Sequence, residues 1–428
     1  MRSAAEEFRE LTPEHESTGN PLGWPGYDEA RERAAAQESV VYGNAVIGGI
    51  KVVLIEFEFG FLGGSVGRAT GDRLVHAFST ARERGVPVVS SIATGGSRMQ
   101  EGMLSLLQLQ RVAKECQLNR DSGIPHIAVL RDPTTGGVWA SLGSGADVVL
   151  GVEGAQVGFA GRRVRKPEDA GHPAFTAEGQ FAAGQVDAVV RTDELAETVG
   201  TWLELLTGGQ PEPAEVPHAL GEAELPESGW DAVLRARAPR RPRARAYLES
   251  YLDSYALISG DRAGGVDSGM LCGVGRRGGR SIAFAAQAGT PTRPAGYRTA
   301  TRLIGLADRL GIPVLTLIDT PGADNSAASE AAGLAPSIAG AFSAAVSTRI
   351  PVTTLVIGEG GSGGALALAG PERTWITPDG YFSVIGPQAA AAILKRPEED
   401  VPAVADQLKL RPQDLLELGL VAGIAPHR

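Results

Sequence analysis

The stretch "IPVTTLVIGEGGSGGALAL" (350–368) contains the pattern that decides the fold. It begins with a short run of apolar and β-branched residues, which is typical of a buried strand. Five glycines then fall within seven residues (358–364), and small apolar residues follow at helical spacing. Glycine at this density costs backbone entropy, so the turn must need either bare backbone or very close packing. A strand, a glycine turn and a helix in this order indicate a βαβ unit of a parallel sheet.

A second copy of this pattern lies earlier in the chain. The matching segments are 85–96 with 311–322, and 124–161 with 350–386. Pro87 and Pro313 are 226 residues apart, and so are Pro125 and Pro351. One offset shared by two separate motifs indicates an internal duplication. Both halves alternate apolar strands, glycine turns and helical segments, so we predict an α/β protein of two related domains with largely parallel sheets.

The residues between the two copies have the composition of a linker. Segment 208–240 is rich in Pro, Glu and Ala, and six arginines fall between Arg235 and Arg245. We therefore predict one domain over 1–207, a loosely packed linker over 208–240 and a second domain over 241–428. The arginines could form a solvated face, or they could contact a phosphorylated ligand or partner.

Composition excludes several classes of protein. The net charge of −10 over 428 residues does not suit a nucleic-acid-binding protein. The two cysteines, Cys116 and Cys272, lie in apolar patterns and are predicted to be core thiols. The six histidines lack the spacing of metal ligands, so no metal site is expected. No signal peptide or run of eighteen apolar residues is present, and we expect a soluble cytoplasmic protein.

The glycine turns are the candidate functional site, because ligands of parallel α/β sheets bind at the carboxyl ends of the strands. At "TTGG" (134–137) and "GEGGSGG" (358–364) a strand ends and a helix begins. The first N–H groups of a helix have no internal partner, and glycine allows a substrate oxygen to approach them. Two such groups can stabilise an oxyanion, the second coming from "TGGSR" (94–98) or "TPGAD" (320–324). The alternative is that the glycines only permit tight packing.

Other chemistries can be weighed against this one. Residues 360–364 match the G-x-S-x-G nucleophile elbow around Ser362, but that motif needs a later histidine, and only His427 follows. No phosphate-binding G-x-x-x-x-G-K-[ST] loop exists. Glu359 and Asp132 precede the two turns and could act as bases, or they could hold the turns by hydrogen bonds to the backbone. Chemistry performed by backbone N–H groups is what remains.

The two halves resemble the β and α subunits of bacterial acetyl-CoA carboxylase carboxyltransferase. The first half carries "FEFGFLGGSVG" (57–67), "GGSRMQEGMLSLLQ" (95–108), "DPTTGGVWAS" (132–141) and "GAQVGFAGRRV" (154–164). The second half carries "YLESYLDSYALISGDRA" (247–263), "PAGYRTATRLIGLADRLGIPVLTLIDTPGA" (294–323) and "VIGEGGSGGALAL" (356–368). The likeness covers about residues 40–205 and 240–425. It implies a fused β–α chain with two tandem crotonase-like (ββα-spiral) domains related by duplication.

This resemblance implies a biotin-dependent carboxyltransferase that moves a carboxyl group from carboxybiotin to the α-carbon of acetyl-CoA or a related acyl thioester. It assigns the thioester oxyanion to Gly136 and Gly137, and the biotin ureido oxygen to Gly360 and Gly361. The substrate-binding residues that it implies are Gly95, Gly96, Ser97, Arg98, Gly322, Ala323, Gly363 and Gly364. An alternative function is a biotin-independent decarboxylase of malonyl-type thioesters, and a third is a non-catalytic scaffold.

The resemblance also implies partners and an assembly. No Met-Lys biotinylation motif occurs, so biotin would arrive on a biotin carboxyl carrier protein that is charged by biotin carboxylase. A homodimer or a dimer of dimers is expected, with the site between a β-type half and an α-type half of different protomers. The chain departs from the family in lacking a four-cysteine zinc ribbon and in its short segment "AQAGTPTRPAGYR" (286–298). This leaves open whether the thioester is carried by CoA or by acyl-carrier protein.

Overall fold

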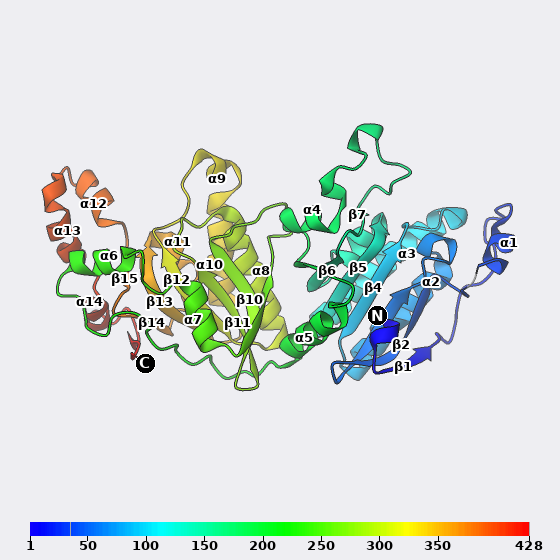
Figure 1. Ribbon diagram of the computed structural model, residues 1–428, viewed down its shortest axis with the longest axis horizontal. Helices are drawn as coiled ribbons and strands as arrows, with labels where there is room; N and C mark the ends of the chain where they lie inside the picture. Colours follow the sequence, from blue (N-terminus) through cyan, green and yellow to red (C-terminus); the bar gives the residue numbers. More distant parts are fainter. Residues whose placement is uncertain (35, 428) are drawn as a thin grey trace. The chain divides into compact units, whose positions relative to one another are not determined.

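The computed structural model describes residues 1–34 and 36–427, which divide into two compact units (Figure 1). Unit 1 comprises Met1–Thr207 together with Arg262–Gly264, and unit 2 comprises Gly208–Asp261 and the residues from Gly265 onwards. Each unit contains its own eight-stranded sheet. Among the described residues, no helix combines the length and the apolar character needed to cross a membrane.

The sheet of unit 1 begins with antiparallel strands and continues with parallel ones. Along the sheet lie β1 (Glu7–Leu11), β2 (Val40–Ile47), β3 (Ile50–Phe57), β4 (Val88–Thr94), β5 (His126–Thr135), β6 (Val148–Val152) and β8 (Ala188–Val190), while β7 (Val157–Gly158) pairs with the end of β5. The helices are α1 (Tyr27–Glu32), α2 (Arg68–Arg84), α3 (Gly102–Asp121), α4 (Ala177–Ala182) and α5 (Leu195–Thr207). Every residue of β4 is buried, as expected for a central parallel strand covered on both faces.

The sheet of unit 2 has the same plan. Its strands are β9 (Ser254–Ile258), β10 (Met270–Arg277), β11 (Arg280–Gln287), β12 (Val314–Thr320), β13 (Val352–Gly361), β14 (Thr374–Ile376) and β16 (Gly423–Ile424), while β15 (Tyr381–Ser383) pairs with the end of β13. The helices are α6 (Gly229–Arg237), α7 (Ala244–Tyr251), α8 (Pro294–Leu310), α9 (Ala327–Ala331), α10 (Leu334–Ser347), α11 (Ser362–Leu366), α12 (Pro387–Ile393), α13 (Val401–Gln407) and α14 (Pro412–Glu417). In this unit α8 packs against β10, β11 and α10 (Figure 1).

The duplication is confirmed at the level of single hydrogen bonds. β12 and β13 begin and end 226 residues after β4 and β5 respectively. The hydroxyl oxygen of Thr94 accepts a hydrogen bond from the N–H of Gly96 (3.0 Å), and Thr320 accepts one from Gly322 (3.1 Å) in the same way. Backbone bridges repeat as well, between Val66 and Ser97 and between Thr292 and Ala323. The two turns therefore share one backbone construction.

The expected linker is instead a packed part of unit 2. Segment 208–240 contains α6, which lies against α13 and β13. Ala232, Val233 and Ala236 on one face of α6 are fully buried and belong to a core cluster with Ala405. The amphipathic spacing of these small residues explains the difference, because it lets α6 bury one face within a stretch that is rich in proline and charge overall.

The cysteines are free thiols, as their apolar surroundings predicted. Cys272 is buried on β10, and Cys116 on α3 is partly covered. Burial raises the pKa of both thiols to about 12, so both are neutral at physiological pH and are poor nucleophiles.

Candidate active site

The turns that follow β4 and β5 touch each other at the floor of a cavity in unit 1. Gly96 has a φ of 105° and Gly136 has a φ of 73°, which lie in the region that favours glycine. A Cβ atom on Gly136 would lie 3.1 Å from the Cα atom of Gly96. A side chain at either position would strain the backbone or push the two turns apart, so the glycines are required for this close approach.

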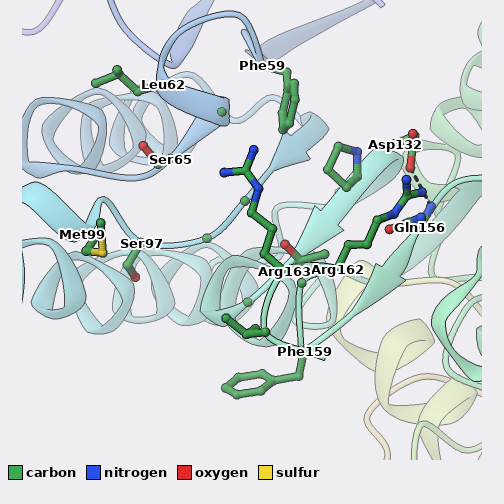
Figure 2. A pocket seen from close by; sticks show the side chains of 18 of the residues that line it. Phe59, Leu62, Ser65, Ser97, Met99, Asp132, Gln156, Phe159, Arg162 and Arg163 are labelled. Carbon is green, nitrogen blue, oxygen red and sulfur yellow. Dashed lines mark hydrogen bonds between the residues drawn. The ribbon is translucent and has the colours of Figure 1, made fainter. Parts of the chain in front are cut away.

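The cavity above these turns has a volume of about 950 Å³. Among the residues that line it are Gly95, Gly96, Ser97, Gly136, Phe159 and Arg163. Figure 2 shows Arg163 extending across the cavity toward Phe59, whereas Arg162 turns away and donates a hydrogen bond to the side-chain oxygen of Gln156. In the described parts of the chain, Arg163 has no hydrogen-bond or ion-pair partner. Sequence reasoning missed it, although it lies in the motif "GAQVGFAGRRV".

The N–H groups of the first turn are not all available to a substrate. The N–H of Gly136 donates to the carbonyl oxygen of Phe159 (3.0 Å), because the chain after β7 returns beside the end of β5. The N–H of Gly96 donates to Thr94. Gly137, the next residue, has no hydrogen-bond acceptor for its N–H among residues 1–34 and 36–427. Of the predicted pair, Gly137 therefore offers a hydrogen-bond donor, whereas Gly136 is needed for the backbone conformation of the turn.

The second turn begins two residues later than predicted. Gly360 and Gly361 are the last residues of β13, where they pair with Phe382 and Ser383 of β15. A Cβ atom on Gly361 would lie 2.1 Å from the carbonyl oxygen of Pro321, so this glycine is needed for close packing. The positions that match Gly136 and Gly137 at the 226-residue offset are Ser362 and Gly363. Ser362 has a positive φ of 58°, as Gly136 does.

Gly363 occupies open space in the second turn. A Cβ atom built on it has no heavy atom within 4 Å, and its N–H, like that of Gly137, finds no acceptor in the described structure. The neighbouring turn contributes Ala323, whose N–H points away from Thr292, because the bridge bonds use the residues on either side of it. The nitrogen of Ala323 lies 2.5 Å from the place of a Cβ atom on Gly364, so Gly364 is a packing glycine.

Arg98 does not face the cavity, contrary to its predicted role in substrate binding. Its side chain is 1% exposed and forms ion pairs with Glu38 and Glu101. Burial by itself would lower the pKa of Arg98, but the hydrogen bond and charge of Glu38 outweigh it and raise the pKa. The bridge to Val66 turns this residue inward, so Arg98 is part of the core of unit 1.

The two carboxylates that precede the turns hold backbone and side chains in place. Asp132 accepts a hydrogen bond from the N–H of Gln156 (3.0 Å), which ties β5 to the segment before β7. Glu359 accepts hydrogen bonds from Arg237 and from the hydroxyl of Tyr381, both at 2.8 Å. Asp132 thus holds its turn through the backbone as predicted, whereas the carboxylate of Glu359 is bound by side chains instead.

Neither a nucleophile nor a metal centre is evident in the described residues. His427, the only histidine after Ser362, contacts the carbonyl oxygen of Gly221 at 2.9 Å, which engages it away from the turn. No group of three or more potential metal ligands was found within residues 1–34 and 36–427. The donors that this site offers include backbone N–H groups of the turns and the guanidinium of Arg163.

Comparison with known proteins agrees with this arrangement. Residues 8–214 match the carboxyl transferase domain family, and residues 227–427 match the acetyl co-enzyme A carboxylase carboxyltransferase-like family. The fused subunits beta/alpha of the acetyl-coenzyme A carboxylase carboxyl transferase from Salinispora tropica are 38% identical over 427 residues, which cover 93% of this chain and 75% of the relative. A probable biotin-dependent acyl-coenzyme A carboxylase beta3 subunit from Mycobacterium tuberculosis is 34% identical, with 95% and 85% covered.

Solved structures show the same fold. A transcarboxylase 12S structure with methylmalonyl-coenzyme A bound superposes with a TM-score of 0.81 at 20% identity, covering 99% of this chain and 85% of that one. The two units are thus tandem crotonase-like domains. Together, the duplicated turns, the shared fold and the identity along almost the whole chain establish that this protein belongs to the family of acetyl-CoA carboxylase carboxyltransferases, as a β–α fusion.

Proposed function

We propose that this protein transfers a carboxyl group from carboxybiotin to the α-carbon of an acyl thioester, giving a malonyl-type thioester. The observation that carries the proposal is the pair of duplicated turns, each of which offers a backbone N–H that has no acceptor among the residues the structure describes, in a chain of the biotin-dependent carboxyltransferase family. Backbone donors of this kind stabilise the negative charge that develops on a thioester oxygen when its α-carbon is deprotonated.

Unit 1 is the proposed thioester site. The N–H groups of Gly137 and Ser97 would bind the thioester oxygen at the floor of the cavity. Phe59 and Phe159 line the cavity and provide apolar surface for the acyl group and its pantetheine arm. Arg163 supplies a positive charge at the cavity, which fits the phosphate groups carried by CoA or by the prosthetic group of acyl-carrier protein.

Unit 2 is the proposed biotin site. The open space beside Gly363, together with the N–H groups of Gly363 and Ala323, fits a ureido oxygen. Biotin, delivered on a carrier protein, would supply the carboxyl group and a basic nitrogen when bound there. The chain itself binds and orients the two reactants, which is consistent with turns that bear backbone donors in place of a side-chain base.

We further propose that the active enzyme is a homodimer or a dimer of dimers, in which unit 1 of one protomer meets unit 2 of another. Helix α3 and the turn before it expose large apolar side chains: Met103, Leu106 and Leu107 on the helix, and Met99, which also lines the cavity. Around the second turn Leu366 and Val384 are also exposed. Neighbouring large apolar side chains that are exposed are typical of an interface, and two-fold closure is the commonest way to cover it.

The test is to incubate the protein with malonyl-CoA in the presence and absence of free biotin. Carboxyltransferase activity predicts loss of malonyl-CoA that depends on biotin. Rapid decarboxylation without biotin would support the decarboxylase instead, and no turnover of malonyl-CoA or malonyl-acyl-carrier protein under any condition would contradict both.

A further inference from the structure

The arginines that precede α7 are used inside unit 2. Arg241 is only 4% exposed, and its guanidinium contacts one carboxylate oxygen of Asp319 at 2.5 Å. Arg243 contacts the other oxygen at 3.1 Å. Asp319 is itself 1% exposed and also accepts a hydrogen bond from the N–H of Glu359 (3.2 Å). The basic segment is therefore neither a solvated face nor a free anion site at these positions.

Arg241 connects the two strands that carry the second turn. Besides Asp319 at the end of β12, it donates to the carbonyl oxygen of Ile357 near the end of β13 (3.2 Å). Arg237 on α6 adds a hydrogen bond to Glu359 on β13, and Tyr381 on β15 donates to the same carboxylate. Only an arginine has enough planar donors to serve a carboxylate and a carbonyl at once.

The arrangement is specific to the second half. The residues 226 positions before Asp319 and Glu359 are Ala93 and Pro133, which carry no charge. The first turn keeps the same backbone hydrogen bonds, and the charged groups near it, Arg98 and Arg131, stand at other positions and form their own ion pairs. The charged cluster of Asp319 and Glu359 is therefore particular to the turn of unit 2.

We propose that Arg241, supported by Arg237, is a positioning residue for the second turn. By fixing the ends of β12 and β13 to each other, it keeps the N–H groups of Ala323 and Gly363 converging on one point. The segment before α7 is then a structural part of the biotin site. This inference rests on the proposed function only for the identity of the ligand; the positioning itself can be tested without it.

The experiment compares Arg241→Met and Arg241→Lys with Arg240→Met as a matched control, because Arg240 is exposed and has no partner in the described structure. For Arg241→Met we expect the kcat of the biotin-dependent reaction to fall by about 10²-fold, the size of losing one oxyanion donor. The KM for the thioester should not change, because that site lies in unit 1. Arg241→Lys should retain part of the activity that Arg241→Met loses, since lysine keeps the positive charge but lacks the planar guanidinium.

Hydrogen exchange provides a readout that does not need biotin. Amides of 355–368 should exchange faster in Arg241→Met than in the control, while those of 126–140 stay unchanged. Should Arg241→Met fail to fold, Arg237→Gln tests the supporting contact with Glu359 at a more exposed position. Unchanged kcat and unchanged exchange at 355–368 would overturn the proposal, and so would faster exchange throughout unit 2. A wild-type protein without biotin-dependent turnover refutes the proposed function, and exchange alone then decides the positioning.

Discussion

Substitutions at Gly361 and Gly363 separate packing from catalysis within one turn. In Gly361→Ala the new Cβ atom would lie 2.1 Å from the oxygen and 2.2 Å from the carbonyl carbon of Pro321. Carbon atoms rest about 3.5 Å or more apart, so the backbone of Pro321 would have to move by more than about 1 Å. Overpacking typically costs about 1–3 kcal/mol, and a clash with backbone belongs at or above the upper end. We expect Gly361→Ala to lose about 3 kcal/mol of unfolding free energy.

Gly363→Val should behave in the opposite way. Nothing lies within 4 Å of the new Cβ atom, so this branch point meets open space and not the backbone that Gly361→Ala meets. The side chain would instead occupy the space that a ureido oxygen needs beside the N–H of Gly363. The biotin-dependent reaction should then slow by about 10²–10³, the usual effect of losing one such donor.

Two measurements on the same samples decide the matter. Urea unfolding gives stability, and the reaction of malonyl-CoA with free biotin gives activity, with Gly305→Ala as a control at an exposed glycine of α8 that has no positive φ and no neighbour within 4 Å of its Cβ position. Wild-type stability for Gly361→Ala would refute the packing argument. Near-normal turnover for Gly363→Val in a folded protein would refute the placement of the second donor.

Three further outcomes are expected. Burial lowers the pKa of His126 from 6.5 to about 4, so its contribution to stability is complete above pH 6.5 and is lost as the pH falls toward 4, by up to about 3 kcal/mol. Urea unfolding at both ends of this range should show that the unfolding free energy depends less on pH in His126→Gln than in the wild type. An equal pH dependence in the two proteins would contradict a buried neutral imidazole. Arg163→Ala should raise the KM for acyl-CoA but leave the KM for an acyl-pantetheine without phosphate unchanged. An equal change in both KM values would refute the proposed contact between Arg163 and a phosphate group. Leu107→Glu should dissociate the assembly in light scattering, and an unchanged mass would show that α3 is not at the interface.

Sequence alone determined the architecture. The apolar runs before each glycine turn predicted parallel strands, and the common offset of the prolines predicted the duplication, because both are local patterns that any chain of this fold must repeat. The motifs that resemble the family also pointed to the two turns in which we propose the site. The shared offset of 226 residues also matches Gly136 with Ser362, although a comparison of the two glycine-rich motifs had suggested that Gly136 matches Gly360.

The tertiary structure decided which atoms of those turns are available. Sequence cannot tell where a strand ends inside a run of glycines, since glycine fits strand, turn and helix alike, and pairing with β15 placed Gly361 inside β13. Nor can it tell that the chain after β7 takes up the N–H of Gly136, or that Arg98 pairs with Glu38, sixty residues away. The contact of Arg241 with Asp319 is of the same kind: it joins residues that are distant in sequence, and only packing brings them together.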